Sequence, residues 1–179
     1  MYETKRTPAG DAVTSLIPDV FRLNNRLLTA GDRLVARLGL TSARWQILHA
    51  IAVAERPQPV AWLARDLGAN RQNVQRIIND LYEEALVAFA ANPHHRRAQL
   101  VILTEKGRQA LAAAMVLQAP WVDGVSDGLL VEDIETAHRV VMALRHKLER
   151  NDDADGQAIA EGGGNVAYTD ERDREPQQG

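Results

Sequence analysis

A run of amide and arginine side chains near the middle of the chain carries the residue types best suited to specific recognition. No acidic residue interrupts positions 70–76. In the major groove of DNA, arginine pairs with guanine O6 and N7, and asparagine and glutamine pair with adenine. The side chains that we expect to contact or position DNA from this run are Asn70, Arg71, Gln72, Asn73, Gln75 and Arg76.

A second basic cluster follows at a turn rich in asparagine, proline and histidine. Two β-prone runs, 86–90 and 99–103, flank this turn and predict a hairpin. An arginine on a projecting tip suits the narrow minor groove and its negative potential. A solvated turn is the alternative interpretation, but the position directly after the first run favours DNA. We therefore add His95, Arg96 and Arg97 to the expected DNA contacts.

The elements that must position these residues follow from the hydrophobic spacing. A short helix over 60–68 ends at Gly68, and a second helix over 71–85 begins after Asn70, which has the residue type of an N-cap. Val74 and Ile77 turn inward on this second helix, so the amides and arginines face outward. Two helices joined by a tight turn that contains glycine predict a helix-turn-helix.

Longer helices are predicted on both sides of this unit. A helical pattern begins at Leu16 and ends at Gly39, and a further helix runs over 43–54 after Thr41 or Ser42. After the hairpin, Thr104 caps a helix that we expect to stop at Pro120. The last helix spans 129–150 and has an apolar seam suited to another helix, consisting of Ile134, Ala137, Val141, Leu144 and Leu148. We expect this seam and the first helix to pack across a two-fold axis, with packing inside one chain as the alternative.

The sequence thus predicts a mainly α fold with a small β-hairpin wing, in which long terminal helices serve dimerisation. The expected parts are a flexible arm (1–12), helical dimerisation segments (13–39 and 104–150), a winged helix-turn-helix (40–103) and an acidic, glycine-rich disordered tail (151–179). The tail holds eight acidic and two basic residues, a net charge of −6. The other 150 residues hold 19 basic and 16 acidic residues, so the body carries +3 and suits a polyanion.

Composition excludes several functional classes. None of the 179 residues is cysteine, which excludes disulfides, thiolate metal sites and cysteine nucleophiles. No run approaches the roughly 18 apolar residues of a membrane helix, and the first residues lack a signal-peptide pattern, so we expect a cytoplasmic protein without a membrane partner. Nucleophile elbows and Walker loops are absent from the sequence, so we expect no enzyme and no cofactor. His138 and His146 are two helical turns apart, too far to share a metal unaided, so no metal site is predicted.

Residues 40–111 resemble a MarR-type winged-helix transcription regulator. The matching stretches are Leu40–Leu48, Val60–Gly68, Asn70–Arg76, Asn92–Arg97 and Leu103–Arg108. The resemblance implies a homodimer that binds a pseudo-palindromic operator on double-stranded DNA, and a small, often aromatic effector that lowers this affinity. We expect a repressor. The alternative is a winged-helix module that binds protein and is regulated by the acidic tail.

The resemblance also directs attention to an effector cleft and to two departures from the family pattern. Trp45 and His49 lie one turn apart near the implied cleft, and Arg26 could pair with an effector carboxylate; ordinary core and solvated residues are the alternatives. In the wing, His95 stands where the family usually has aspartate, so DNA affinity is predicted to depend on pH. Trp62 stands where a polar residue is usual, and we expect it to pack on a neighbouring helix.

Overall fold

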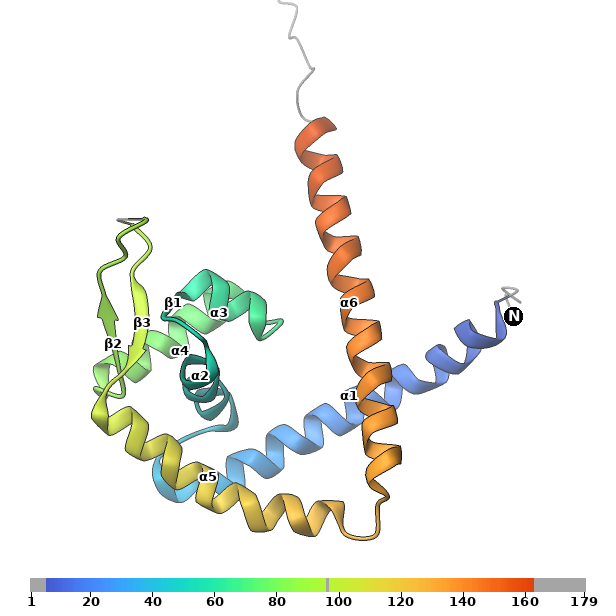
Figure 1. Cartoon of the computed structure of the whole chain (residues 1–179), viewed down its shortest axis with the longest axis horizontal. Helices are drawn as coiled ribbons and strands as arrows, with labels where there is room; N and C mark the ends of the chain where they lie inside the picture. The colour runs from blue at the N-terminus through green and yellow to red at the C-terminus, as the bar shows by residue number, and fades with distance from the viewer. Residues whose placement is uncertain (1–5, 96, 163–179) are drawn as a thin grey trace, which may run out of the picture. The chain divides into compact units, whose positions relative to one another are not determined.

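The computed structural model describes residues 6–95 and 97–162, with the backbone alone for 151–162. The chain divides into two compact units, Met1–Val125 and Ser126–Gly179. In chain order the elements are α1 (Pro8–Val35), the short 3-10 helix η1 (Ala36–Leu38), α2 (Ser42–Val53), β1 (Gln58–Pro59), α3 (Val60–Asp66), α4 (Arg71–Glu83), β2 (Val87–Ala90), β3 (Leu100–Leu103), α5 (Glu105–Ser126) and α6 (Val131–Gly162). This order, a helical chain with a small antiparallel sheet, confirms the predicted fold class (Figure 1).

Helix α1 begins earlier than the sequence pattern indicated. The Thr7 hydroxyl accepts a hydrogen bond from the Gly10 amide (3.1 Å), and Pro8 occupies the first helical turn. Proline is favourable there because its fixed φ is helical and its missing N–H has no helical partner to lose. The flexible arm predicted over residues 1–12 is therefore wrong from Pro8 onward, and residues 1–5 lie outside the described residues. At the other end Gly39 closes the segment with φ +69°, as predicted.

Helices α2, α3 and α4 pack together as the predicted helix-turn-helix and its supporting helix. Their buried apolar side chains form the core of the first unit, which includes Trp45, Ile47, Leu48, Leu63, Val74, Ile78 and Leu81. Gly68 adopts φ +59° in the turn between α3 and α4, a conformation that suits glycine because it has no Cβ. In α2 Ile47 is buried, whereas Ala52 is exposed.

The wing is a three-stranded sheet rather than a simple hairpin. Strands β2 and β3 pair antiparallel, with Val87 opposite Leu103 and Ala90 opposite Leu100. The short β1 adds to the free edge of β3, which gives the order β1-β3-β2. Pro59 has no amide hydrogen, so it fits at an edge and gave no strand signal in the sequence. Through β1 the wing is joined to the residues that start α3.

Helix α5 starts against the residues that directly precede β2 and runs further than predicted. The Thr104 hydroxyl donates to the Ala85 carbonyl (2.7 Å) and accepts from the Gly107 amide (3.0 Å). The Arg108 guanidinium, hydrogen-bonded to the Glu105 carboxylate, holds the pKa of Glu105 below its ordinary value. The helix continues through Pro120 to Ser126, so the predicted stop is wrong. Pro120 has no N–H to donate to the carbonyl of Val116, one helical turn before it. Val116 is 73% exposed, which allows water to reach this carbonyl.

The second unit contains α6, which follows Gly128 with φ +76°. The helix extends past its predicted end at Arg150 to Gly162, so the disorder predicted from residue 151 is wrong for its first part. No proline interrupts 151–162, and each further helical residue adds a hydrogen bond to an existing helix. The remainder of the predicted tail, 163–179, lies outside the described residues. Along α6 the predicted seam is apolar, and Ile134, Val141 and Leu148 are exposed in the single chain.

Candidate nucleic-acid interface

The start of α4 presents the predicted polar run on its outer side. Val74, Ile77, Ile78 and Leu81 are buried along the opposite face of this helix. The Asn70 side chain accepts from the amides of Gln72 (2.8 Å) and Asn73 (3.3 Å), which confirms the N-cap. Because this cap occupies two amides, they are not free to bind a phosphate. Recognition from this helix therefore depends on its side chains.

The side chains of α4 differ in how firmly they are held. Arg76 donates to Asn73 Oδ1 (3.0 Å) and lies 3.7 Å from the Asp80 carboxylate, while Gln75 donates to Asn79 Oδ1 (2.9 Å). Arg71 and Gln72 are exposed, and within the described chain their side chains form no hydrogen bond or ion pair. An anionic partner can therefore pair with Arg71 without competition, whereas it must compete with the Asp80 carboxylate to pair with Arg76.

The wing tip is closed by a side chain that the sequence interpretation did not single out. Asn92 Nδ2 donates to the Ala98 carbonyl (2.8 Å), and Asn92 Oδ1 accepts from the His94 amide (3.0 Å). The Ala98 amide also donates to the His95 carbonyl (3.0 Å). These bonds turn the chain between β2 and β3 and place the exposed His95 and Arg97 on the tip. Arg96 lies outside the described residues.

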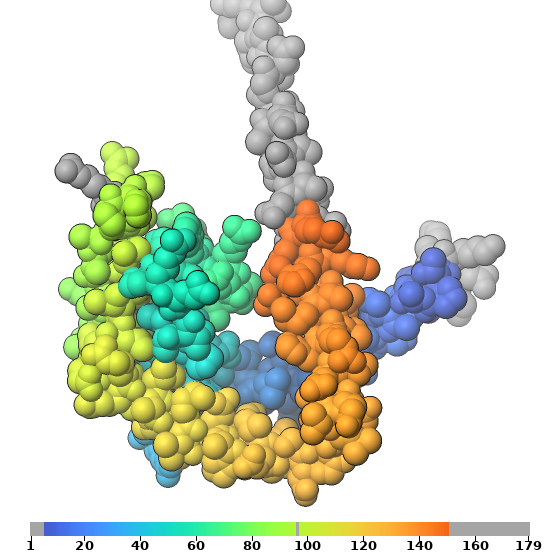
Figure 2. All heavy atoms as spheres, in the orientation of Figure 1, coloured from blue at the N-terminus to red at the C-terminus, as the bar shows by residue number. Residues whose placement is uncertain are grey.

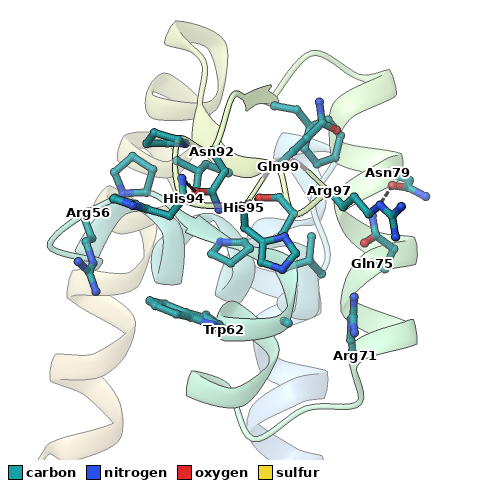
Figure 3. Close-up of a pocket in the computed structure, with 18 residues that line it drawn as sticks. Arg56, Trp62, Arg71, Gln75, Asn79, Asn92, His94, His95, Arg97 and Gln99 are labelled. Carbon is teal, nitrogen blue, oxygen red and sulfur yellow. Dashed lines mark hydrogen bonds between the residues drawn. The ribbon is translucent and has the colours of Figure 1, made fainter.

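A groove of about 870 Å³ separates the wing from the helix-turn-helix. Figure 3 shows Arg71, Gln75 and Asn79 along one side, Trp62 and Arg56 toward the other, and the wing residues above them. The cationic or titratable side chains that line this groove are Arg56, Arg71, His94, His95 and Arg97, and its described lining contains no carboxylate. In the space-filling view the hairpin rises beside the segment around α3 (Figure 2). Such a groove of one charge sign concentrates an anion.

Arg56 and Trp62 are groove residues that the sequence interpretation did not assign. The Arg56 guanidinium lies 5.6 Å from the centroid of the Trp62 ring, a cation–π distance, and Trp62 is 50% exposed. Trp62 is thus a surface aromatic as predicted, but its described partner is a loop arginine rather than a neighbouring helix. Because β1 pairs with β3, the residues on either side of β1, Arg56 and Trp62, lie close to the wing. No local sequence pattern indicates the pairing of β1 with β3.

Histidines in the groove predict a dependence of DNA affinity on pH. Both imidazoles line the groove beside Arg56, Arg71 and Arg97, and histidine is the side chain suited to act as a charge switch near neutral pH. DNA affinity at fixed salt, compared between about pH 6 and about pH 8, tests this predicted dependence. Fluorescence anisotropy with a labelled duplex measures this change. A His94→Gln/His95→Gln variant should show a flatter profile, and equal profiles for the two proteins would refute the assignment.

A second cavity, of about 600 Å³, lies in the same unit between α1, α2 and α5. Trp45 and His49, the residues predicted for an effector site, both line it. Trp45 is 8% exposed and belongs to the core, while His49 is exposed. Arg26 is exposed on α1 and is not part of the wall, so the structure does not bring the three predicted residues together.

The described part of the chain offers neither a metal cluster nor a membrane-spanning helix. No group of three or more histidine or carboxylate side chains there is arranged to hold a metal ion. None of its helices combines the length and apolarity needed to cross a membrane.

Comparison with known proteins relates this architecture to regulators of transcription. Residues 38–98 match a family model described as the MarR family. An uncharacterized protein of Mycobacterium tuberculosis is 38% identical over 139 residues, which cover 75% of this chain and 96% of that protein. The transcriptional activatory protein BadR of Rhodopseudomonas palustris is 27% identical over 145 residues, which cover 79% of this chain and 83% of BadR.

Two solved structures extend the comparison. The M. tuberculosis transcriptional regulator MosR in complex with DNA is 25% identical, with a TM-score of 0.58 over 72% of this chain and 97% of that chain. CouR from Rhodococcus jostii, bound to p-coumaroyl-CoA, is 18% identical, with a TM-score of 0.64 over 70% of this chain and 87% of that chain. At 18% identity the likeness to CouR concerns the fold alone.

Proposed function

The chain belongs to the MarR family of DNA-binding transcription regulators, and from this premise we propose that it binds a pseudo-palindromic operator as a homodimer. In this proposal the protein represses transcription, because operator occupancy blocks the promoter, and a small molecule releases it. The relative named BadR is described as an activator, so repression is the part of the proposal that a transcription assay must decide.

The observation that carries the proposal is the cationic groove between α4 and the wing. Its lining joins Arg71 of α4, Arg97 of the wing and Arg56 of the preceding loop, with no carboxylate among the described residues. The major groove of DNA is about 12 Å wide and admits a helix. With the start of α4 in the major groove, the wing lies over the flanking backbone and minor groove. We assign base contacts to Arg71, Gln72, Asn73 and Gln75, cap and positioning roles to Asn70 and Arg76, and backbone or minor-groove contacts to His95, Arg96 and Arg97.

Dimerisation is proposed from the apolar faces of the long helices. On α1 the side chains of Leu16, Val20, Leu23 and Leu27 follow the predicted stripe and are exposed in the single chain. The seam of α6 is likewise exposed, and α6 is the one helix described in the second unit. Contiguous apolar surface of this kind marks an interaction site in a soluble protein. A second copy of the chain is the partner that also doubles the DNA-contacting helix for a two-fold operator.

The dimer proposal predicts that a charge on the α1 stripe weakens association. Leu23 is 58% exposed in the single chain, so Leu23→Glu should leave the protomer folded while placing a carboxylate in the proposed interface. We expect the dissociation constant of the dimer to rise about tenfold or more. Light scattering over a dilution series measures it. Asn25→Glu, at an exposed polar position of the same helix, is the control, and equal dimer stability in both variants would place the interface elsewhere.

Effector control is proposed at the second cavity. Trp45 lies both in its wall and in the buried core beneath the helix-turn-helix, so a ligand there contacts the packing that positions α4. A ligand that binds the free form better than the DNA-bound form must lower DNA affinity by the same factor. The p-coumaroyl-CoA bound to CouR supports effector binding by a protein of this fold.

The experiment that tests the proposed function is a titration of the full chain against DNA from upstream of its own gene. Fluorescence anisotropy at two salt concentrations, with a scrambled duplex of equal length, separates selective from non-selective binding. Selective, salt-sensitive binding together with reduced transcript in a purified transcription assay supports the proposal. Weak binding that is equal on both duplexes overturns it and favours the protein-binding alternative.

A further inference from the structure

The wall of the second cavity has an unusual charge composition for a site expected to accept a carboxylate. Among its lining residues Asp66 is the one carboxylate, His49 is the one imidazole, and no lysine or arginine is present. The arginines of α1 that a carboxylate ligand would need, Arg22, Arg26 and Arg33, do not line it. An anion entering this cavity would lose hydration, and the wall offers no lysine or arginine in exchange.

Asp66 is available to a ligand. It is the last residue of α3, it is exposed, and within the described chain its carboxylate forms no hydrogen bond or ion pair. A carboxylate at the edge of an apolar cavity attracts a cation more strongly than one in open water, because the surroundings have a lower effective dielectric constant. The Asp66 carboxylate, in a wall without lysine or arginine, therefore favours a cation over an anion.

Aromatic surface in the same wall favours a flat ring system. Trp45 of α2 and Trp121 of α5 both line the cavity, together with apolar residues of α1 such as Leu27 and Leu28. Indole faces attract cations as well as aromatic rings. The amide side chains of Gln46 and Gln118 add neutral hydrogen-bonding groups without changing the charge. Ring surfaces with a single carboxylate complement a hydrophobic cation.

We propose that this cavity binds an aromatic cation, a flat ring system carrying a protonated amine or quaternary ammonium, whose rings contact the indoles and whose charge faces Asp66. The inference rests on the proposed effector role of the cavity and names the chemical class of the effector. It replaces the expectation that Arg26 meets an effector carboxylate, because Arg26 is absent from the wall.

A series of matched ligands tests the class directly. Calorimetric titration of the full chain without DNA, at about pH 8, compares 9-aminoacridine (a cation), acridine (neutral) and acridine-9-carboxylate (an anion). We expect the cation to bind about tenfold tighter than acridine, and the anion to bind weakest. Asp66→Asn should remove the preference for the cation, while Glu55→Gln, an exposed carboxylate outside the wall, should retain it.

Each outcome decides the assignment. Tighter binding of the cation that is lost in Asp66→Asn and kept in Glu55→Gln supports it. Equal or tighter binding of the anion, or a cation preference that survives Asp66→Asn, overturns it. DNA anisotropy on both variants separates this proposal from the proposed function, since neither position lines the DNA groove and both variants should bind DNA like wild type. If the wild-type protein does not bind DNA, the proposed regulatory function is refuted. The calorimetry then still reports whether the cavity binds the cation.

Discussion

Replacing both Arg71 and Arg97 by alanine should weaken operator binding by about a hundredfold or more. Both guanidiniums face the groove between α4 and the wing, and neither has a partner within the described chain. An arginine that contacts a base or inserts into a groove contributes about 1–3 kcal/mol to binding. The two residues come from elements that meet different parts of the duplex, so their contributions should add. The slope of log affinity against log salt should also become shallower, because fewer counterions are released.

Single variants and a matched control show which arginines account for the loss of DNA affinity. Arg76→Ala should cost less than Arg71→Ala, since Arg76 is already engaged by Asn73 and Asp80. Arg37→Ala removes the same charge from an exposed position of η1 outside the groove and should leave affinity and salt slope unchanged. Anisotropy titrations with the upstream duplex measure all four proteins. An unchanged affinity in the Arg71→Ala/Arg97→Ala protein would contradict the assignment of this groove to DNA.

Gly107→Ala should lower the free energy of unfolding by about 3 kcal/mol or more, a large effect for one methyl group. A Cβ at Gly107 would overlap the Leu86 carbonyl oxygen, which belongs to the backbone and cannot rotate away. Leu86 is itself fixed, because its carbonyl accepts from the Thr104 amide (3.2 Å). The start of α5 would have to move away from Leu86, the residue that leads into β2, which breaks the contact between this helix and the base of the wing.

Gly124→Ala provides the control, since it makes the same substitution in the same helix. A Cβ there meets nothing within 4 Å, so alanine should stabilise the helix by about 0.5–1 kcal/mol through its higher propensity. Urea unfolding followed by circular dichroism gives both values, provided that each protein is measured at the same concentration. Equal stabilities for the two variants would show that the helix is not held against Leu86 as described.

Local sequence patterns account for most of the helix-turn-helix. The apolar spacing of α4 placed Val74 and Ile77 inward, and the Asn70 cap was predicted from residue type. Both features depend on neighbours within a few positions, so a sequence reports them directly. The same local rules failed at Pro8 and Pro120. The segment that contains Pro8 was predicted to be a flexible arm and Pro120 to stop a helix, although Pro8 starts one helix and Pro120 lies inside another.

The candidate DNA interface was predictable in its residue types but not in its pairing. The sequence indicated that Arg71, Arg76 and Arg97 face solvent, because each falls on a polar face or a turn. It did not indicate that Arg76 is engaged by Asp80 while Arg71 is free, since that depends on side-chain geometry. Arg56 lies in the interface because it lies just before β1, and β1 pairs with β3 across more than forty residues of chain.

By itself the sequence determined the helices, the turn and the polar outer face of α4, because helical periodicity and capping act over a few residues. The tertiary structure alone decided which distant side chains share a cavity. Asp66 from α3, Trp45 from α2 and Trp121 from α5 line one wall, and Arg26 does not. Their meeting depends on how three helices pack, and packing is set by the summed fit of many side chains rather than by any local pattern. We propose that this arrangement of two indoles and a carboxylate favours an aromatic cation over an anion as the ligand of the cavity.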